Sequence, residues 1–159
     1  MSETQRTERW PSARIDAVVR LRALAAGVRN AAYAERVIAA PFDAVWAIYG
    51  DLERGVPRFE WSVRSLAITR RDGEALEIES SGPLGSSAQF RAIWRPGWCV
   101  MRDLRGIGQI GMAAAPEGEG RTRVAHFEGS RRLGALLHPF LQRRVEGDLA
   151  RLAALCEVR

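Results

Sequence analysis

Residues 34–61 constrain the fold of this chain most, because the segment changes structural type over a short distance. An apolar run over residues 37–40 ends at Pro41, whose ring fixes φ and removes the backbone N–H. A strand therefore stops there, and the first turn of a helix accepts the proline. The apolar residues that follow fall on adjoining faces of a helical turn: Val45, Trp46 and Tyr49. The segment thus predicts a strand that leads directly into a short helix.

Most of the remaining chain reads as short strands separated by turns. Asp72-Gly73 is a strong hairpin signal, and Pro96-Gly97 and the glycine-rich run over 117–120 mark further turns. The predicted elements are a strand over 33–40, a second helical piece over 52–59, and strands over 61–71, 76–80, 90–95, 98–104, 107–115 and 121–128. Short connections between consecutive strands imply a curved antiparallel sheet.

The two ends of the chain have a helical period instead. Apolar residues recur at three- and four-residue steps over 133–156, which predicts a long helix that Pro139 should kink or restart. A second amphipathic helix is predicted over 13–29, with Ser12 as its cap. It can pack on its own domain, line a dimer interface or rest on a membrane surface. The predicted organisation is an N-terminal extension over 1–32 and one domain over 33–159.

The whole pattern resembles a known superfamily. The resemblance covers about residues 33–158, and its carriers are the run 38–46, Asp51, Pro57, Trp61, Val63, Arg95-Pro96-Gly97, the run 120–124 and the helix over 133–155. They resemble the START-like, Bet v 1-like (SRPBCC) superfamily of polyketide cyclases/dehydrases and lipid transport proteins. The resemblance implies an α+β helix-grip fold, in which a seven-stranded antiparallel sheet curves around the C-terminal helix. The helix over 13–29 is then an addition, and no cofactor is implied.

Families of this kind hold an apolar ligand between the sheet and the last helix. If the helix covers the concave face, the predicted wall residues are Leu76, Ile78, Phe90, Trp94, Trp98, Val100, Leu136, Leu137 and Phe140. The alternative for these side chains is a filled core, and Trp46 and Trp61 are expected to be core anchors. The first functional hypothesis is therefore binding of a hydrophobic small molecule, such as a lipid, a quinone or a polyketide-like aromatic.

Polar side chains within the same strands support a second hypothesis. His126 and Glu128 lie at i and i+2 on one face of a strand, and Arg102 shares the alternation of Trp98 and Val100. Aimed into an apolar cavity, these three residues suit the acid–base steps of a cyclase or dehydratase. The alternatives are a rim histidine beside a solvated glutamate and an exposed strand arginine. A third hypothesis is an interaction module that uses the helix over 13–29.

Composition excludes several classes of site and partner. The net charge of +5 comes with interspersed acids and with no nucleic-acid motif, so no nucleic-acid partner is predicted. Cys99 and Cys156 lack the number and spacing of a zinc site or a disulfide framework, so no metal is predicted and a reducing, cytoplasmic location is expected. A monomer or a homodimer with a small-molecule ligand is expected, and peripheral membrane contact remains an alternative.

Overall fold

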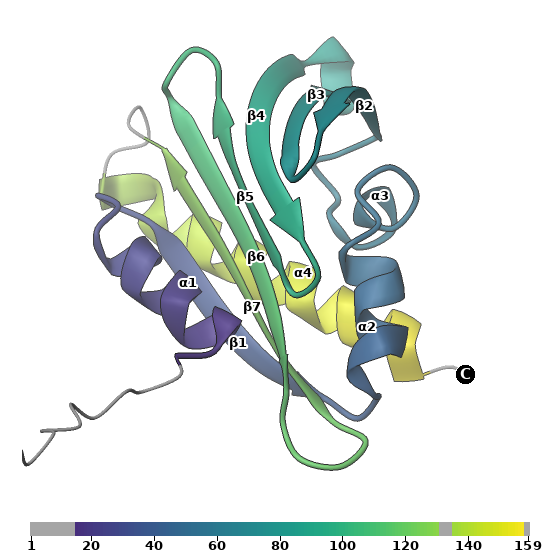
Figure 1. Cartoon of the computed structure of the whole chain (residues 1–159). Helices are drawn as coiled ribbons and strands as arrows, with labels where there is room; N and C mark the ends of the chain where they lie inside the picture. Colours follow the sequence, from purple (N-terminus) through teal and green to yellow (C-terminus); the bar gives the residue numbers. More distant parts are fainter. Residues whose placement is uncertain (1–14, 131–134, 158–159) are drawn as a thin grey trace, which may run out of the picture.

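The computed structural model describes residues 15–130 and 135–157 (Figure 1). In chain order the elements are α1 (Ala17–Ala26), β1 (Ala32–Ile38), α2 (Phe42–Tyr49), α3 (Val56–Phe59), β2 (Ser65–Asp72), β3 (Ala75–Ser81), η1 (Pro83–Gly85), β4 (Ser87–Arg95), β5 (Trp98–Asp103), β6 (Gly108–Pro116), β7 (Thr122–Ser130), η2 (Ala135–Leu137) and α4 (His138–Glu157). The predicted strands and the predicted α+β class are confirmed.

All seven strands form one antiparallel sheet in the order β1-β7-β6-β5-β4-β3-β2. The sheet curves around α4, with α2 and α3 at one side, as the helix-grip prediction requires (Figure 1). The turn at Asp72-Gly73 confirms its hairpin signal, because Gly73 has a φ of +58°, a conformation that glycine adopts without strain. Pro139 lies in the first turn of α4, directly after η2, so it begins the α-helix and does not kink it.

The inner layer is formed by α4 on the concave face of the sheet. Val145, Leu149 and Leu152 are fully or almost fully buried and belong to the main core cluster, together with inward side chains of every strand. Gln142 also satisfies the free edge of β1, because its amide accepts from the backbone N of Tyr33 (3.1 Å) and donates to the backbone O of the same residue (2.8 Å). This pairing covers a strand edge that would otherwise be open to another chain.

The outer layer is formed by α1, which crosses the convex face over β6 and β7 (Figure 1). Val18, Leu21 and Ala25 of α1 are buried in a separate cluster with Phe127 and small residues of the two strands. The helix therefore packs on its own domain, the first of the three alternatives. Its cap is Asp16, whose carboxylate accepts from the backbone N of Val19 at 2.9 Å, and the expected cap Ser12 lies outside the described residues.

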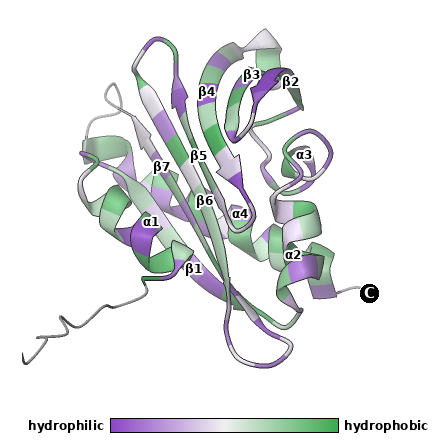
Figure 2. Ribbon diagram, in the orientation of Figure 1, coloured by the Kyte–Doolittle hydropathy of each residue, from purple (hydrophilic) through white to green (hydrophobic). Residues whose placement is uncertain are grey.

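In Figure 2 the hairpin between β6 and β7 is largely hydrophilic where it extends beyond α1 and α4. Of the two predicted aromatic anchors, Trp46 is buried at 9% exposure, whereas the expectation for Trp61 was wrong because 54% of it is exposed. Among the described residues, no helix is long and apolar enough to cross a membrane.

Candidate functional site

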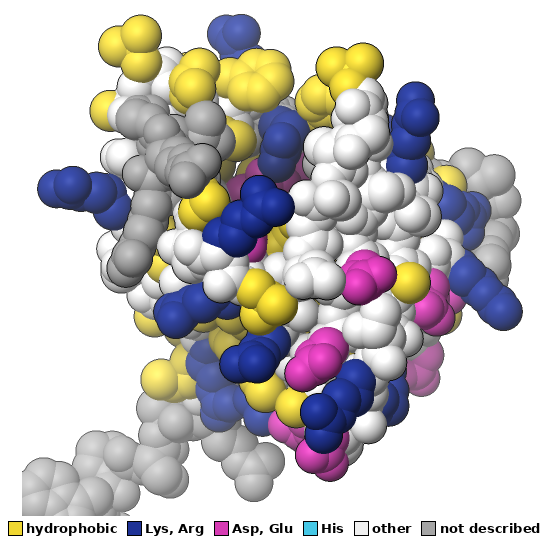
Figure 3. Space-filling view, turned by 90° about the horizontal axis from the view of Figure 1, so that it is seen from above, with side chains coloured by type: hydrophobic (Ala, Val, Ile, Leu, Met, Phe, Trp, Pro, Cys, Tyr) yellow, Lys and Arg dark blue, Asp and Glu magenta, His cyan; other side chains and the backbone are white. Residues whose placement is uncertain are grey.

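A cavity of about 190 Å³ lies between the inner face of the sheet, the end of α3 and α4. Its apolar wall is formed by Val56, Val63, Leu66, Phe90, Met101, Ile110 and Met112. Its polar wall is formed mainly by serines of the β3–β4 connection, with Glu60 and Arg144. Figure 3 looks onto this end of the molecule and shows charged side chains within a hollow that hydrophobic side chains flank.

The alternation of β7 determines which polar groups face inward. Ala125 and Phe127 belong to the outer cluster under α1, so His126 and Glu128 point to the opposite face. Both are buried, with exposures of 0% and 5%. This burial excludes the alternative of a rim histidine beside a solvated glutamate.

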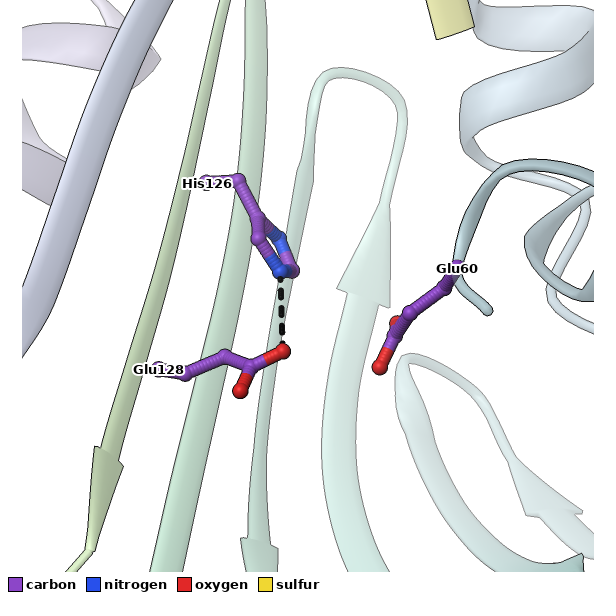
Figure 4. A group of neighbouring side chains, drawn as sticks. All are labelled: Glu60, His126 and Glu128. Carbon is purple, nitrogen blue, oxygen red and sulfur yellow. Dashed lines mark hydrogen bonds and ion pairs between the residues drawn. The ribbon is translucent and has the colours of Figure 1, made fainter. Parts of the chain in front are cut away.

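Three titratable side chains converge at this place, as Figure 4 shows. Nε2 of His126 lies 3.4 Å from Oε1 of Glu128. Glu60, which follows α3 and is 4% exposed, points its carboxylate toward them from the other side. One ligand-type atom from each of the three lies within 4.8 Å of the others. The sheet and the α3 segment, far apart in sequence, thus contribute to one buried cluster.

Two further groups orient the carboxylates of this cluster. Arg144 of α4 makes a close ion pair with Oε2 of Glu128, and the hydroxyl of Ser62 donates to Oε1 of Glu60 at 3.0 Å. Asp148, one turn further along α4, is fully buried and pairs with Arg151. Nδ1 of His126 makes no hydrogen bond of good geometry within the described residues.

Burial dominates the electrostatics of the cluster. It lowers the pKa of His126, and the negative charges of Glu60 and Asp148 oppose this effect only in part, so the imidazole is neutral at neutral pH. Burial raises the pKa of Glu60, and the hydrogen bond from Ser62 and the charge of Arg144 oppose this effect only in part. Burial also raises the pKa of Asp148. The site therefore combines a neutral base with carboxyl groups that hold protons more tightly than usual.

The predicted wall residues divide into three groups. Phe90 lines the cavity, whereas Leu76, Ile78 and Trp94 face inward into the filled part of the core. Trp94 in particular is fixed there, because its Nε1 donates to the backbone O of Gly50 at 2.9 Å. For these three residues the filled-core alternative describes their surroundings.

The second and third groups lie elsewhere. Trp98 and Val100 pack against the outer cluster, because the inward positions of β5 are taken by Cys99 and Met101. Arg102 shares the face of Trp98 and Val100 and is exposed, which agrees with the alternative of an exposed strand arginine. The remaining three predicted wall residues lie in η2 and in the first turn of α4. They are exposed and do not line the cavity: Leu136 by 95%, Leu137 by 46% and Phe140 by 58%. The site proposed below therefore keeps Phe90, His126 and Glu128 from the predicted set.

Sequence reasoning missed Glu60 and Arg144, the charged residues on the cavity wall. Glu60 follows a four-residue helix and fits no periodic pattern. Arg144 had a detectable signal, since it lies three residues after buried Leu141 and beside buried Val145. A charged residue on the apolar stripe of a helix is a candidate for a buried site.

Two other hollows, of about 490 and 430 Å³, lie on the convex side of β2–β5, which α1 does not cover. Outward-facing side chains such as Glu79, Gln89 and Arg91 line them. Although both are larger than the inner cavity, they are open surface depressions without a buried titratable group. The inner cavity is therefore the candidate site.

Comparison with known proteins bears on the fold. No family model and no curated protein sequence matches the chain. Among solved structures, the aromatase/cyclase ZhuI from Streptomyces sp. R1128 is similar with a TM-score of 0.65, 16% identity, and coverage of 80% of this chain and 93% of that chain. A START superfamily protein from Mycobacterium smegmatis gives a TM-score of 0.61, 14% identity, and coverage of 80% and 97%. TTHA0849 from Thermus thermophilus gives 0.61, 24% identity, and coverage of 80% and 97%.

Proposed function

The chain has the START-like, Bet v 1-like helix-grip fold, and on this premise we propose that it binds a hydrophobic small molecule between the sheet and α4. The observation that supports the proposal most is the inner cavity, whose wall includes Phe90, Met101 and Ile110. Ligand sites are typically concave, mostly apolar and equipped with a few convergent polar groups. Glu60 and Arg144 supply those polar groups here.

The size of the cavity restricts the ligand class. Its volume of about 190 Å³ is below the roughly 300–1,000 Å³ of common ligand pockets. Of the three predicted classes, a compact ring compound such as a quinone or a polyketide-like aromatic fits better than a long-chain lipid. Arg144 offers a donor for a ring oxygen, and Glu60 accepts from a ring hydroxyl or donates when protonated.

Native mass spectrometry of the freshly purified protein tests the proposal first, followed by extraction and identification of any copurifying molecule. A matched pair of variants then locates the site with an apolar fluorescent probe, anilinonaphthalene sulfonate. We expect Ile110→Trp, which fills the cavity, to weaken probe binding at least tenfold, since small changes in an apolar pocket have effects of roughly 10- to 200-fold. Ile93→Trp, on the exposed outer face, is the control. Equal probe binding by both variants would contradict the proposed site.

A second candidate function is a dehydratase or cyclase of the acid–base type, and the buried cluster favours it. Glu60 lies on the cavity wall, so its carboxylate can remove a proton from the carbon next to a carbonyl and give the same proton to the departing β-hydroxyl, while Arg144 donates to the carbonyl oxygen. The C–H and C–O bonds break, a C=C bond forms and water leaves. Glu60 thereby returns to its starting state, with His126 and Glu128 buried behind it. Arg102 has no part in this scheme because it lies on the opposite face.

Turnover separates the two candidates. We expect Glu60→Gln to abolish dehydration of an aromatic β-hydroxy ketone while the probe still binds, because it removes the proton-transfer group and little apolar surface. The measurement is the absorbance of the conjugated product in single-turnover mixtures. A wild-type protein that binds the ketone unchanged over hours would leave the binding function and exclude the enzymatic one for this substrate.

A further inference from the structure

The buried cluster of Glu60, His126 and Glu128 also has the composition of a metal site. We infer that these three side chains bind one divalent transition-metal ion of the zinc class at the inner end of the cavity. Sequence reasoning found no sign of this site, because its ligands come from residue 60 and from a strand more than sixty residues later. The inference does not depend on the proposed ligand binding, although both concern the same cavity.

The distances suit such an ion. At zinc–ligand distances of roughly 2.0–2.2 Å, tetrahedral ligand atoms lie about 3.4 Å apart. Nε2 of His126 and Oε1 of Glu128 are separated by 3.4 Å. Glu60 completes a set whose atoms all lie within 4.8 Å of one another, so a small rotation of its side chain closes the remaining gap. Figure 4 shows that its carboxylate already points toward the other two groups.

The donor atoms indicate the class of metal. Imidazole nitrogen with carboxylate oxygen suits zinc, manganese, iron and cobalt. Three protein ligands leave at least one coordination position open, as in catalytic zinc sites and unlike closed structural sites. Glu60 is on the cavity wall, so the open position is adjacent to the space where a small molecule would lie.

The surroundings of the ligands support the same assignment. Arg144 holds Oε2 of Glu128 and Ser62 holds Oε1 of Glu60, which leaves one oxygen of each carboxylate to face the cluster. Outer groups that fix ligand orientation in this way are a regular part of metal sites. Among the described residues Glu60 has no ion-pair partner, so when it is ionised Glu60, Glu128 and Arg144 together carry one negative charge in excess in a buried place. A bound cation neutralises that charge.

Zinc binding is measured with tag-free, full-length protein, by equilibrium dialysis against micromolar ZnCl₂ and elemental analysis. We expect one zinc per chain. A second measurement uses Co²⁺, whose visible absorption bands report the geometry of the bound ion. Glu60→Gln and His126→Gln should each weaken binding by at least tenfold, the lower end of the roughly 10- to 100-fold loss seen when even outer-shell partners are removed.

His138→Gln is the matched control, because the chain has only two histidines and Nε2 of His138 lies 3.1 Å from the backbone O of Ala31. It should bind zinc like the wild type, and thermal melts establish that each variant is folded. Absence of stoichiometric zinc and cobalt binding would overturn the inference. So would zinc binding as tight as that of the wild type in the folded Glu60→Gln and His126→Gln variants. Probe binding without metal binding would contradict the metal site and leave the proposed ligand binding intact. Metal binding without probe binding would support the metal site and contradict the proposed ligand binding.

Discussion

The two faces of the sheet carry helices in different ways. On the convex face, α1 packs directly against β6 and β7 through a dry cluster that includes Leu21 and Phe127. On the concave face, α4 packs against β1 and β7 but leaves a cavity beside β4–β6, with Arg144 and Glu60 on its wall. One sheet thus combines a filled layer with a hollow layer.

The sequence of β6 and β7 explains much of this difference. Several outward positions are small, namely Gly111, Ala113 and Ala115 of β6 and Ala125 of β7, so α1 approaches the strands closely although Phe127 also points outward. The inward positions are longer or polar and include Met112, His126 and Glu128. Long side chains hold α4 away from this part of the sheet, and polar ones require partners. The comparison teaches that the filled face stabilises the fold while the hollow face is free to hold a ligand.

The largest difference between the faces should appear when one phenylalanine is removed from each. Phe127→Ala removes a fully buried ring from the filled layer and should lower the free energy of unfolding by about 3–5 kcal/mol. Phe90→Ala removes a half-buried ring at the cavity wall, where fewer contacts are lost, and should cost less than about 2 kcal/mol. Urea denaturation at equilibrium measures both. Equal losses would mean that the two layers are packed alike.

A single added methyl group tests the close approach of α1. A Cβ at Gly111 would lie 2.2 Å from Cε1 of Phe127 and 2.6 Å from Cδ1 of Leu21. Gly111→Ala should therefore cost about 1–3 kcal/mol through overpacking. Gly108→Ala on the same strand is the control, because the nearest atom to its added Cβ is 3.9 Å away. If the two variants unfold at the same urea concentration, α1 is not packed on β6 as described.

The sequence predicted the backbone arrangement more completely than the site. The strands, the hairpin at Gly73 and the shared face of His126 and Glu128 follow from local alternation and turn chemistry, which depend on neighbours in sequence. Alternation alone does not say which parity of a strand faces in. Trp98 and Val100 were therefore assigned to the inner face, although Cys99 and Met101 occupy it.

Residues that reach the site from outside regular periods were beyond sequence reasoning. Glu60 follows α3 and meets β7 only through the tertiary fold. Apolar character was also misleading at Leu136 and Phe140, since the inward turn of α4 begins at Leu141. The helical period of apolar residues identifies the stripe of a helix that packs against the sheet. It does not identify the residue at which this packing begins or ends.

The ion pairs of Arg123, one of which joins it to the cap of α1, should have a smaller effect than the apolar contacts of α1. Arg123 lies 2.7 Å from Oδ2 of Asp16 and 2.9 Å from Oε2 of Glu117, and these partners are more than one third exposed. Arg123→Gln should therefore cost about 0.5–1.5 kcal/mol, the range for one or two partly exposed pairs. The loss should shrink at high salt, because salt screens exposed charges. Urea denaturation at low and high NaCl measures it, and a loss as large as that of Phe127→Ala would show that charge, not packing, holds the outer layer.

The smallest effect is expected where α4 begins, and it sharpens the boundary of the inner layer. Leu137 was predicted as a wall residue, but 46% of it is exposed, so Leu137→Ala should change the free energy of unfolding by less than about 0.5 kcal/mol. Leu141, in the first turn of α4, is 4% exposed, and Leu141→Ala should cost about 2–5 kcal/mol. The two variants together thus locate the boundary between exposed and buried residues at the start of α4. A large loss for Leu137→Ala would place this residue inside the inner layer, which would then extend to the end of the helix and leave less of the cavity open.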